Sequence, residues 1–259
     1  MSIVHFYKYQ AAGNDFLLVD NRSGEYAFSS EEIAGLCHRR FGIGADGIIF
    51  LNQEPGVDFR MVYHNADGST SFCGNGCRAI VHFAQVLNVI DRTAVFMAHD
   101  GRHEAQILDD GNIRVSLNDV RTIEPKGPDD FYINTGTDHH VRFVEGLDNY
   151  PVVEEGRKIR YSSSYPRGTN ANFVERQAGG QIAFRIYERG VEDETLSSGS
   201  GATACALVAA RRYDLPSPIL IKARGGYLLV EFQSKPDGAF TNLFFIGPAQ
   251  LVFETRLEI

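Results

Sequence analysis

Apolar residues recur in short runs along most of the chain, separated by glycine, asparagine and aspartate. Runs of this length, rich in Val, Ile, Phe and Tyr, are typical of β-strands. One early segment differs, because Ser29 and Glu32 can form a capping box ahead of an apolar stripe, and it predicts a surface helix over residues 30–40. The predicted strands cover residues 4–9, 16–20, 47–51, 59–64, 94–98, 104–108, 113–117, 131–135, 140–144, 172–176, 182–187, 219–223, 227–232, 239–245 and 250–254.

Two further segments, residues 78–87 and 202–210, are apolar on nearly every face of a helix. A helix without a polar face has to be buried. One buried helix among many strands indicates a sheet that curls around it. The chain therefore reads as an α+β protein with one such arrangement in each half.

Each of the two buried helices is preceded by the same short pattern, x-Gly-x-Gly. It reads CGNG at residues 73–76 and SGSG at residues 198–201. The copies start about half the chain apart, which indicates an internal repeat. Between the halves, residues 118–127 have the composition of a linker. We therefore predict two domains, residues 1–118 and residues 119–259, with the last strand able to pack back on the N-terminal half.

Composition excludes several classes of partner. The formal net charge of −8 disfavours nucleic acid, because binding phosphates requires a basic surface. The longest stretch of small apolar residues, 202–210, is far shorter than the roughly 20 residues of a membrane span. Four cysteines in a chain of this length do not suggest a disulfide framework, and the N-terminus has no secretory signal pattern. These features predict a cytoplasmic protein with reduced thiols and no membrane or nucleic-acid partner.

The repeated helix starts carry candidate chemistry. The unpaired N–H groups and partial positive charge of a helix N-terminus bind carboxylates, and glycines let the ligand approach the backbone. Two such ends sharing one carboxylate would hold the attached Cα between residues 73 and 198. A thiol at a helix N-terminus forms a thiolate more easily, so Cys73 is a candidate base. A base on one face and an acid on the other invert a stereocentre.

This arrangement needs no metal or cofactor. Cys73 and Cys77 have the spacing of a metal pair, but no further ligands recur at matching positions and the second copy offers none. The logic is that of amino-acid racemases and epimerases that work without pyridoxal phosphate. We therefore expect no cofactor and no metal.

Six blocks follow one another along the chain, at residues 12–16 (AGNDF), 41–46 (FGIGAD), 65–69 (NADGS), 73–78 (CGNGCR), 168–173 (GTNANF) and 187–202 (YERGVEDETLSSGSGA). In these blocks, and over nearly its full length, the chain resembles bacterial diaminopimelate epimerases. The resemblance implies two pseudo-symmetric halves, each a mixed barrel-like sheet around a central helix. It implies a homodimeric isomerase that interconverts LL- and meso-diaminopimelate for lysine and peptidoglycan precursors.

By position in these blocks, the resemblance makes Cys73 one of the two catalytic residues, with Ser198 at the place of the other. The first residues of the two helices would offer backbone N–H groups to the carboxylate at the reacting carbon, and a further set would hold the substrate, largely at its distal amino-acid end. The first set is Gly74, Asn75, Gly199 and Ser200, and the second is Asn14, Asn65, Asn170, Glu188 and Arg189.

Two positions depart from the family pattern. The second catalytic residue of the family is a cysteine, and this chain has Ser198, whose hydroxyl is a poor base. We therefore predict epimerisation far below that of a two-thiol enzyme; whether the serine is engineered or natural stays open. Residues 137–139 (TDH) stand where the family often has Asn or Ser followed by Pro-His, so one expected substrate-binding Asn is missing.

Two other functions stay open. One is a relative of the same fold, a proline or hydroxyproline racemase or a dehydratase, in which one thiol base suffices when the substrate loses water. The other is a catalytically inactive protein that retains the pocket and binds the amino acid. The block at residues 65–69 and the Glu188-Arg189 pair favour a substrate with a second charged end, and hence diaminopimelate.

Overall fold

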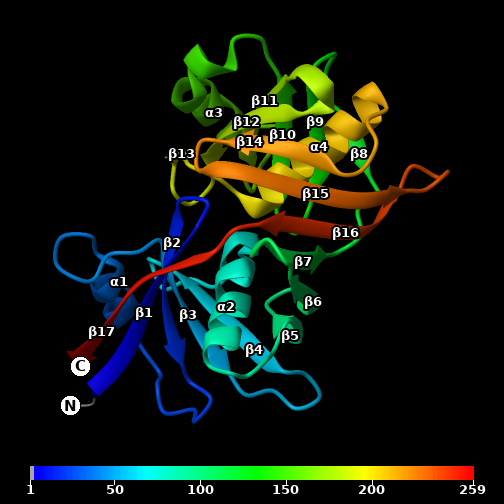
Figure 1. The fold of residues 1–259 in the computed structure, drawn as a ribbon. Helices are drawn as coiled ribbons and strands as arrows, with labels where there is room; N and C mark the ends of the chain where they lie inside the picture. The colour runs from blue at the N-terminus through cyan, green and yellow to red at the C-terminus, as the bar shows by residue number, and fades with distance from the viewer. Residues whose placement is uncertain (1–2) are drawn as a thin grey trace. The chain divides into compact units, whose positions relative to one another are not determined.

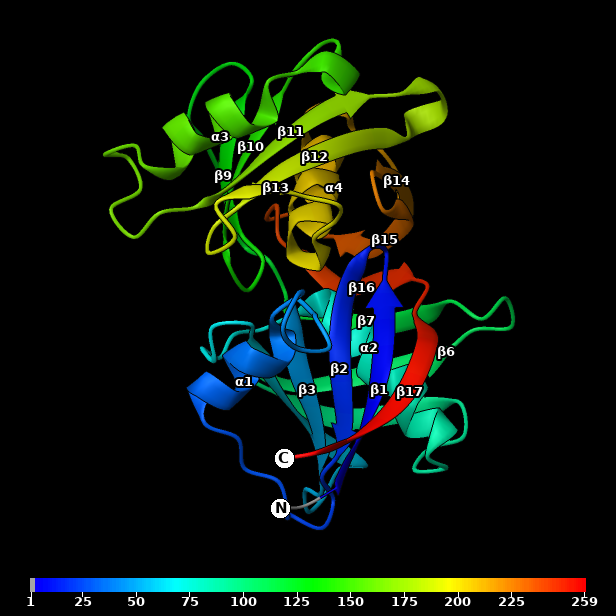
Figure 2. The same ribbon diagram turned by 90° about the vertical axis from the view of Figure 1, so that its left-hand side faces the viewer.

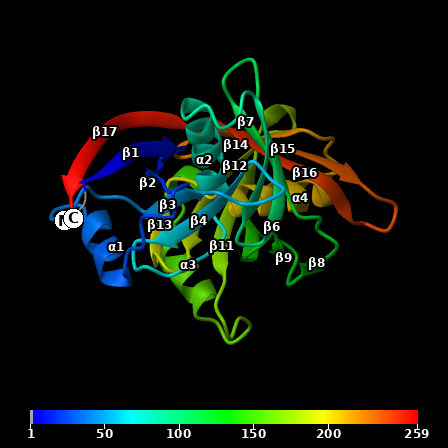
Figure 3. The same cartoon turned by 90° about the horizontal axis from the view of Figure 1, so that it is seen from below.

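The computed structural model describes residues 3–259 and divides into two compact units. Unit 1 comprises Met1–Val115 together with Gly247–Ile259, and unit 2 comprises Ser116–Ile246. The division falls close to the end of the first predicted domain at residue 118. The C-terminal strand belongs to unit 1, where it pairs with the N-terminal strand (Figures 1 and 3).

Unit 1 is a mixed sheet with one long helix, α2, and one short helix, α1 (Ser30–Cys37). Along the sheet the strands run in the order β17, β1, β2, β3, β4, β5, β6, β7. Their bounds are β1 Ile3–Ala11, β2 Asn14–Asp20, β3 Gly47–Asn52, β4 Phe59–Asn65, β5 Thr93–Ala98, β6 Gly101–Ile107, β7 Ile113–Leu117 and β17 Gln250–Glu258.

Unit 2 has the same plan. Its strands run in the order β8, β9, β10, β11, β12, β14, β15, β16, and the short β13 (Asp193–Thr195) pairs with β12. Two helices accompany them, α3 (Val152–Arg160) and α4. The other strand bounds are β8 Ile123–Pro125, β9 Asp130–Asn134, β10 Asp138–Phe143, β11 Asn170–Arg176, β12 Ile182–Glu188, β14 Ile219–Ala223, β15 Gly226–Ser234 and β16 Phe240–Gly247.

The strand directions establish the internal repeat. In both units successive pairs are antiparallel, antiparallel, parallel, antiparallel, parallel, antiparallel and antiparallel. Parallel neighbours need a crossover connection, usually a helix. The helices stand at these crossovers, α1 and α2 in unit 1, and α3 and α4 in unit 2.

The long helices α2 (Gly74–Val86) and α4 (Gly199–Tyr213) are the cores of their units. Residues 76–81 of α2 and 201–210 of α4 are buried without interruption. Strands of the same unit pack around each helix, as Figure 1 shows for α2 and Figure 2 for α4. The mixed, curled sheet around a buried helix confirms the predicted fold class.

Several predicted elements needed correction. Helix α1 has the predicted capping box at Ser29 but ends at Cys37, before residue 40. The supposed linker at residues 118–127 contains β8, which pairs with β9. Helix α3 was not predicted, because five of its nine residues are Glu, Arg or Lys and only Val152, Gly156 and Ile159 are buried. Helices α2 and α4 begin earlier than the apolar runs, since their first turns are built from the glycine-rich sequences.

Candidate functional site

Both predicted helix starts have the same backbone geometry. Cys73 is the N-cap of α2, with φ −136° and ψ 101°, and the Gly76 N–H donates to its Sγ at 3.4 Å. Ser198 is the N-cap of α4, with φ −144° and ψ 128°, and the Gly201 N–H donates to its Oγ at 3.2 Å. Each side chain therefore lies at the open end of a helix, where an anion is stabilised.

The second glycine of each copy lies in close contact with neighbouring side chains, more closely at Gly201 than at Gly76. A Cβ on Gly76 would lie 3.0 Å from the side-chain tips of Ile49 and Met61. A Cβ on Gly201 would lie 2.7 Å from Asn172 Oδ1, a contact that real Cβ atoms essentially never make. The neighbour is thus apolar at the first start and polar at the second.

In unit 1 the side chains of Asn14 and Asn75 lie beside Cys73. Asn14 Oδ1 accepts a hydrogen bond from Asn75 Nδ2 at 3.3 Å and faces the Cys73 thiol at 3.8 Å. Asn14 Nδ2 donates to Asp46 Oδ2 at 2.5 Å. A carboxylate only accepts, so Asp46 fixes the Asn14 amide with its carbonyl oxygen toward the thiol.

A charge cluster stands behind Asn14, and sequence reasoning did not assign it a role. Asp15 receives two hydrogen bonds from Arg39 and an ion pair from the buried Lys8, and Arg39 also bonds Asp46. Burial acts to raise the pKa of Asp15, but the bonds from Arg39 and Lys8 outweigh it and hold the pKa at about 2. Burial, reinforced by the charge of Asp15, raises the pKa of Asp46. A lysine within an apolar strand, followed by Asn14 and Asp15, was the available signal.

The other three cysteines are core residues. Cys37, Cys77 and Cys205 are buried, whereas Cys73 is partly accessible. Burial raises the pKa of the Cys37 thiol to about 11 and the pKa values of Cys77 and Cys205 well above the usual range. Thiols in that state are poor nucleophiles and bases. Within residues 3–259, Cys73 is therefore the only accessible thiol.

In unit 2 a polar network surrounds the start of α4. Ser198 Oγ is 3.4 Å from Ser200 Oγ, and Thr137 Oγ1 donates to Ser200 Oγ at 3.2 Å. Thr135 Oγ1 donates to the Ser200 carbonyl at 2.9 Å. His139, fully buried, is 2.9 Å from Thr137 Oγ1. The sequence had marked residues 137–139 only as a departure from the family pattern.

The predicted distal-end residues divide into two groups. Asn170, at the start of β11, accepts the Arg189 N–H on its Oδ1 at 2.9 Å, so these two lie together. Glu188 ends β12 opposite Asp193, and the Arg189 side chain is exposed, with Nη1 3.4 Å from the Arg167 carbonyl. Asn65 is different, because its amide bonds Ser69 and Ser71 of its own loop.

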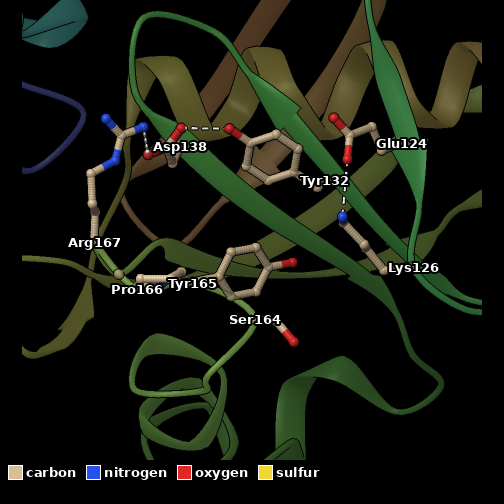
Figure 4. A pocket seen from close by; sticks show the side chains of 9 residues that line it. Glu124, Lys126, Tyr132, Asp138, Ser164, Tyr165, Pro166 and Arg167 are labelled. Atoms are coloured by element: carbon tan, nitrogen blue, oxygen red, sulfur yellow. Dashed lines mark hydrogen bonds and ion pairs between the residues drawn. The ribbon is translucent and has the colours of Figure 1, made fainter.

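A hollow of about 210 Å³ opens beside β8, β9 and the start of β10. Asp138 lines it, accepts a hydrogen bond from Tyr132 and forms an ion pair with Arg167 at 3.9 Å, while the Tyr165 ring lies across from that of Tyr132 (Figure 4). Side chains alternate along a strand. Asp138 therefore points outward, whereas Thr137 and His139 on either side of it point toward the start of α4.

Within residues 3–259, no group of three or more His, Cys, Asp or Glu side chains has the arrangement of a metal site. Over the same residues, no helix is both long and apolar enough to cross a membrane.

Comparison with solved structures shows which fold this is. A phenazine biosynthesis protein of the PhzF family from Bacillus anthracis superposes with a TM-score of 0.79, at 13% identity and over 100% of both chains. A hydroxyproline epimerase from Agrobacterium vitis, with bound trans-4-hydroxy-L-proline, superposes with a TM-score of 0.70, at 12% identity, over 98% of this chain and 92% of that one. At such low identity the likeness extends to the fold alone.

Sequence comparison shows the family. The sequence profile described as "Diaminopimelate epimerase" matches residues 6–123 and 131–252. A diaminopimelate epimerase from Flavobacterium psychrophilum is 45% identical over 97% of this chain and 99% of that protein, and one from Chlorobaculum tepidum is 36% identical over 96% and 99%. The chain therefore belongs to the diaminopimelate epimerase family of isomerases.

Proposed function

We propose that this protein interconverts LL- and meso-diaminopimelate by proton transfer at Cα, without a cofactor. The observation that carries the proposal is the pair of matched helix starts, with Cys73 and Ser198 as N-caps of similar, extended backbone geometry. The names of the relatives supply the substrate, because both relatives described above are diaminopimelate epimerases and match this chain almost end to end.

The substrate carboxylate is bound by backbone groups of the two first helical turns. The backbone N–H groups of Gly74 and Asn75, and those of Gly199 and Ser200, belong to the first turns of α2 and α4 and point out of the N-terminal ends of these helices. Removing the α-proton places negative charge on Cα and the carboxylate. Two helix N-termini directed at that carboxylate stabilise this charge as it develops.

Cys73 is the base in this proposal. Its Sγ receives the α-proton, and before that step the Gly76 N–H stabilises the anionic sulfur. Ser198 stands at the second N-cap and delivers a proton to the opposite face of Cα.

The distal amino-acid end of the substrate has an ammonium and a carboxylate. Arg189 suits the carboxylate, and Glu188 suits the ammonium. Asn170 holds the Arg189 backbone and so places both side chains. Asn14 lies next to Cys73, and we assign it to the reacting end, while Asn65 contributes through the loop that it holds.

Ser198 makes the reaction slow. An alcohol ionises far less readily than a thiol, so a serine is a weak acid and a weaker base in the return direction. The same feature favours a second candidate function, a protein that binds the amino acid and catalyses little or no inversion. A racemase or dehydratase of the same fold is the third candidate.

Incubation with LL-diaminopimelate in deuterated water tests these functions together. We expect meso product with deuterium at the inverted Cα, and its complete loss in the Cys73→Ala variant. Cys37→Ala, which removes a buried thiol, is the matched control and should keep the wild-type rate. A keto acid would instead identify a dehydratase, and thermal stabilisation by the substrate without isotope exchange would identify a binding protein.

A further inference from the structure

A run of hydrogen bonds inside unit 2 ends on Ser198 Oγ. It passes from His139 Nε2 to Thr137 Oγ1 over 2.9 Å, from Thr137 Oγ1 to Ser200 Oγ over 3.2 Å, and from Ser200 Oγ to Ser198 Oγ over 3.4 Å. His139 is fully buried, and Ser198 is almost so. The direction of these bonds decides what the run does for Ser198.

Asn172 sets the direction at the buried end. Its Nδ2 donates to the His140 carbonyl at 2.9 Å, and a carbonyl can only accept, so the orientation of the amide is fixed. The same Nδ2 lies 3.1 Å from His139 Nδ1, which must therefore accept. Burial lowers the pKa of His139 to about 3, so its ring is neutral and its single proton is on Nε2. His139 consequently donates to Thr137.

The hydroxyl of Thr137 continues the run in the same donor-to-acceptor direction. Its Oγ1 accepts from His139 Nε2 and also faces Asn170 Nδ2 at 3.4 Å. The amide of Asn170 is fixed in turn, because its Oδ1 accepts the Arg189 N–H and its Nδ2 donates to the Asp138 carbonyl. A hydroxyl has two acceptor positions and one proton. With both positions taken, the proton of Thr137 goes to Ser200. The hydroxyls of Ser200 and Ser198 are 3.4 Å apart and either could donate, so the Ser200 proton, which Thr137 does not need, is available to Ser198.

We propose that His139 and Thr137 are positioning residues that act through Ser200 to make Ser198 a stronger proton donor. Ser198 Oγ then accepts from Ser200 and from the Gly201 N–H, and its own proton is left for the substrate. In the transfer the Oγ–H bond breaks, a Cα–H bond forms, and the alkoxide keeps both donated bonds. Cys73 Sγ holds the proton taken from the other face, and exchange with water resets both groups.

This inference rests on the proposed function and concerns only the Ser198 half of the reaction. It explains how a serine can serve where a thiol is expected. Donors aimed at an oxygen that gains charge are worth more in a buried site than in water. Because the run starts at a buried neutral ring, it supplies oriented dipoles and does not carry protons to solvent.

The test compares inversion with a reaction that needs Cys73 alone. When the carbon next to Cα carries fluorine, removal of the α-proton by Cys73 expels fluoride, and the enamine hydrolyses to a keto acid and ammonia. In Thr137→Val, which keeps the shape and removes the hydroxyl, we expect kcat for inversion to fall about tenfold, the size of one lost hydrogen bond. KM and fluoride release should not change. Thr137→Ser should restore inversion.

Thr203→Val is the matched control, since Thr203 is equally buried in α4 and its hydroxyl bonds only the Gly199 carbonyl. It should invert at the wild-type rate. Equal rates in Thr137→Val and wild type would overturn the proposal, and so would a parallel fall of inversion and fluoride release. A wild-type protein that does neither reaction would overturn the proposed function itself.

A second measurement is independent of turnover. Nitrogen-15 NMR of His139 at neutral pH should show a neutral ring with its proton on Nε2. A proton on Nδ1, or a charged ring, would reverse or break the run and overturn the proposal.

Discussion

The starts of α2 and α4 have similar backbone conformations. The N-cap side chains at the two starts face hydrogen-bond partners of opposite kind. At Cys73 the side chain faces an acceptor, Asn14 Oδ1, which Asp46 holds in place. At Ser198 it faces the Ser200 hydroxyl, which we assign as the donor at the end of the run from His139. The repeated backbone accounts for binding a carboxylate at both starts. The added side chains make the two positions chemically different, and they are the part of the site that the repeat does not duplicate.

Placing a cysteine at both helix starts should have the largest effect on the rate of inversion. In Ser198→Cys the new thiol would stand at the second N-cap as Cys73 stands at the first, and inversion should accelerate at least a hundredfold, within the usual range of acid–base catalysis. Stereoisomer analysis of the product over time measures this rate. Ser197→Cys, which puts a thiol one residue away, is the control and should not accelerate inversion.

A Ser198→Cys protein that is no faster than wild type would contradict the two-base assignment. The double variant Ser198→Cys/Thr137→Val shows whether the Thr137 hydroxyl matters equally beside a thiol and beside a hydroxyl. A thiol ionises without help from the hydroxyl run, so removing the Thr137 hydroxyl should matter less beside Cys than beside Ser.

The second glycines should differ in their tolerance of a methyl group. In Gly201→Ala the new Cβ would meet Asn172 Oδ1 at 2.7 Å, and Asn172 cannot move without releasing His139. We expect a loss of about 2 kcal/mol in the free energy of unfolding, as for other overpacked cores. In Gly76→Ala the contacts are at 3.0 Å with the tips of Ile49 and the flexible Met61, and the better helix propensity of alanine offsets them.

Urea denaturation of both glycine variants measures the difference. Gly76→Ala should stay within about 1 kcal/mol of the wild type. Equal losses in the two variants would mean that the two helix starts are packed alike, contrary to the geometry around Asn172.

The sequence predicted the parts of the site that are local and missed the parts that are assembled by strand register. Gly-x-Gly after Cys73 or Ser198 is a contiguous signal, and both helix starts followed from it. His139 and Asn172 lie on different strands, and only the parallel pairing of β10 with β11 brings them together. Register of this kind depends on the whole sheet, so Thr137 was visible only as a departure from the family pattern.

The same distinction between local and non-local signals explains the errors in the predicted fold. Helix α1 was predicted from its capping box, which is local, whereas β8 was taken for a linker because three residues ending in Pro125 carry little strand signal. Its pairing with β9 comes from the neighbouring strand and not from its own composition.

The pH dependence of the unfolding free energy separates the two side-chain networks that lie behind the helix starts. The folded protein holds His139 neutral down to about pH 3, whereas in the unfolded chain the ring gains a proton below about pH 6.5. When folding lowers the pKa of a histidine, the free energy of unfolding decreases as the pH falls through that window, by at most about 1.4 kcal/mol per pH unit. His139→Gln should therefore flatten the fall in unfolding free energy between pH 6.5 and pH 4, measured by urea denaturation at each pH.

Asp15→Asn is the matched control from the other network. The pKa of Asp15 is about 2 in the folded protein against 3.8 as its ordinary value, so the stability it contributes is complete above that value and is lost only as the pH falls toward 2. Its removal should lower stability at pH 7 and leave the slope between pH 6.5 and pH 4 as in the wild type. If His139→Gln keeps the wild-type slope, the buried ring is not held neutral, and the direction assigned to the hydrogen bonds that reach Ser198 loses its basis.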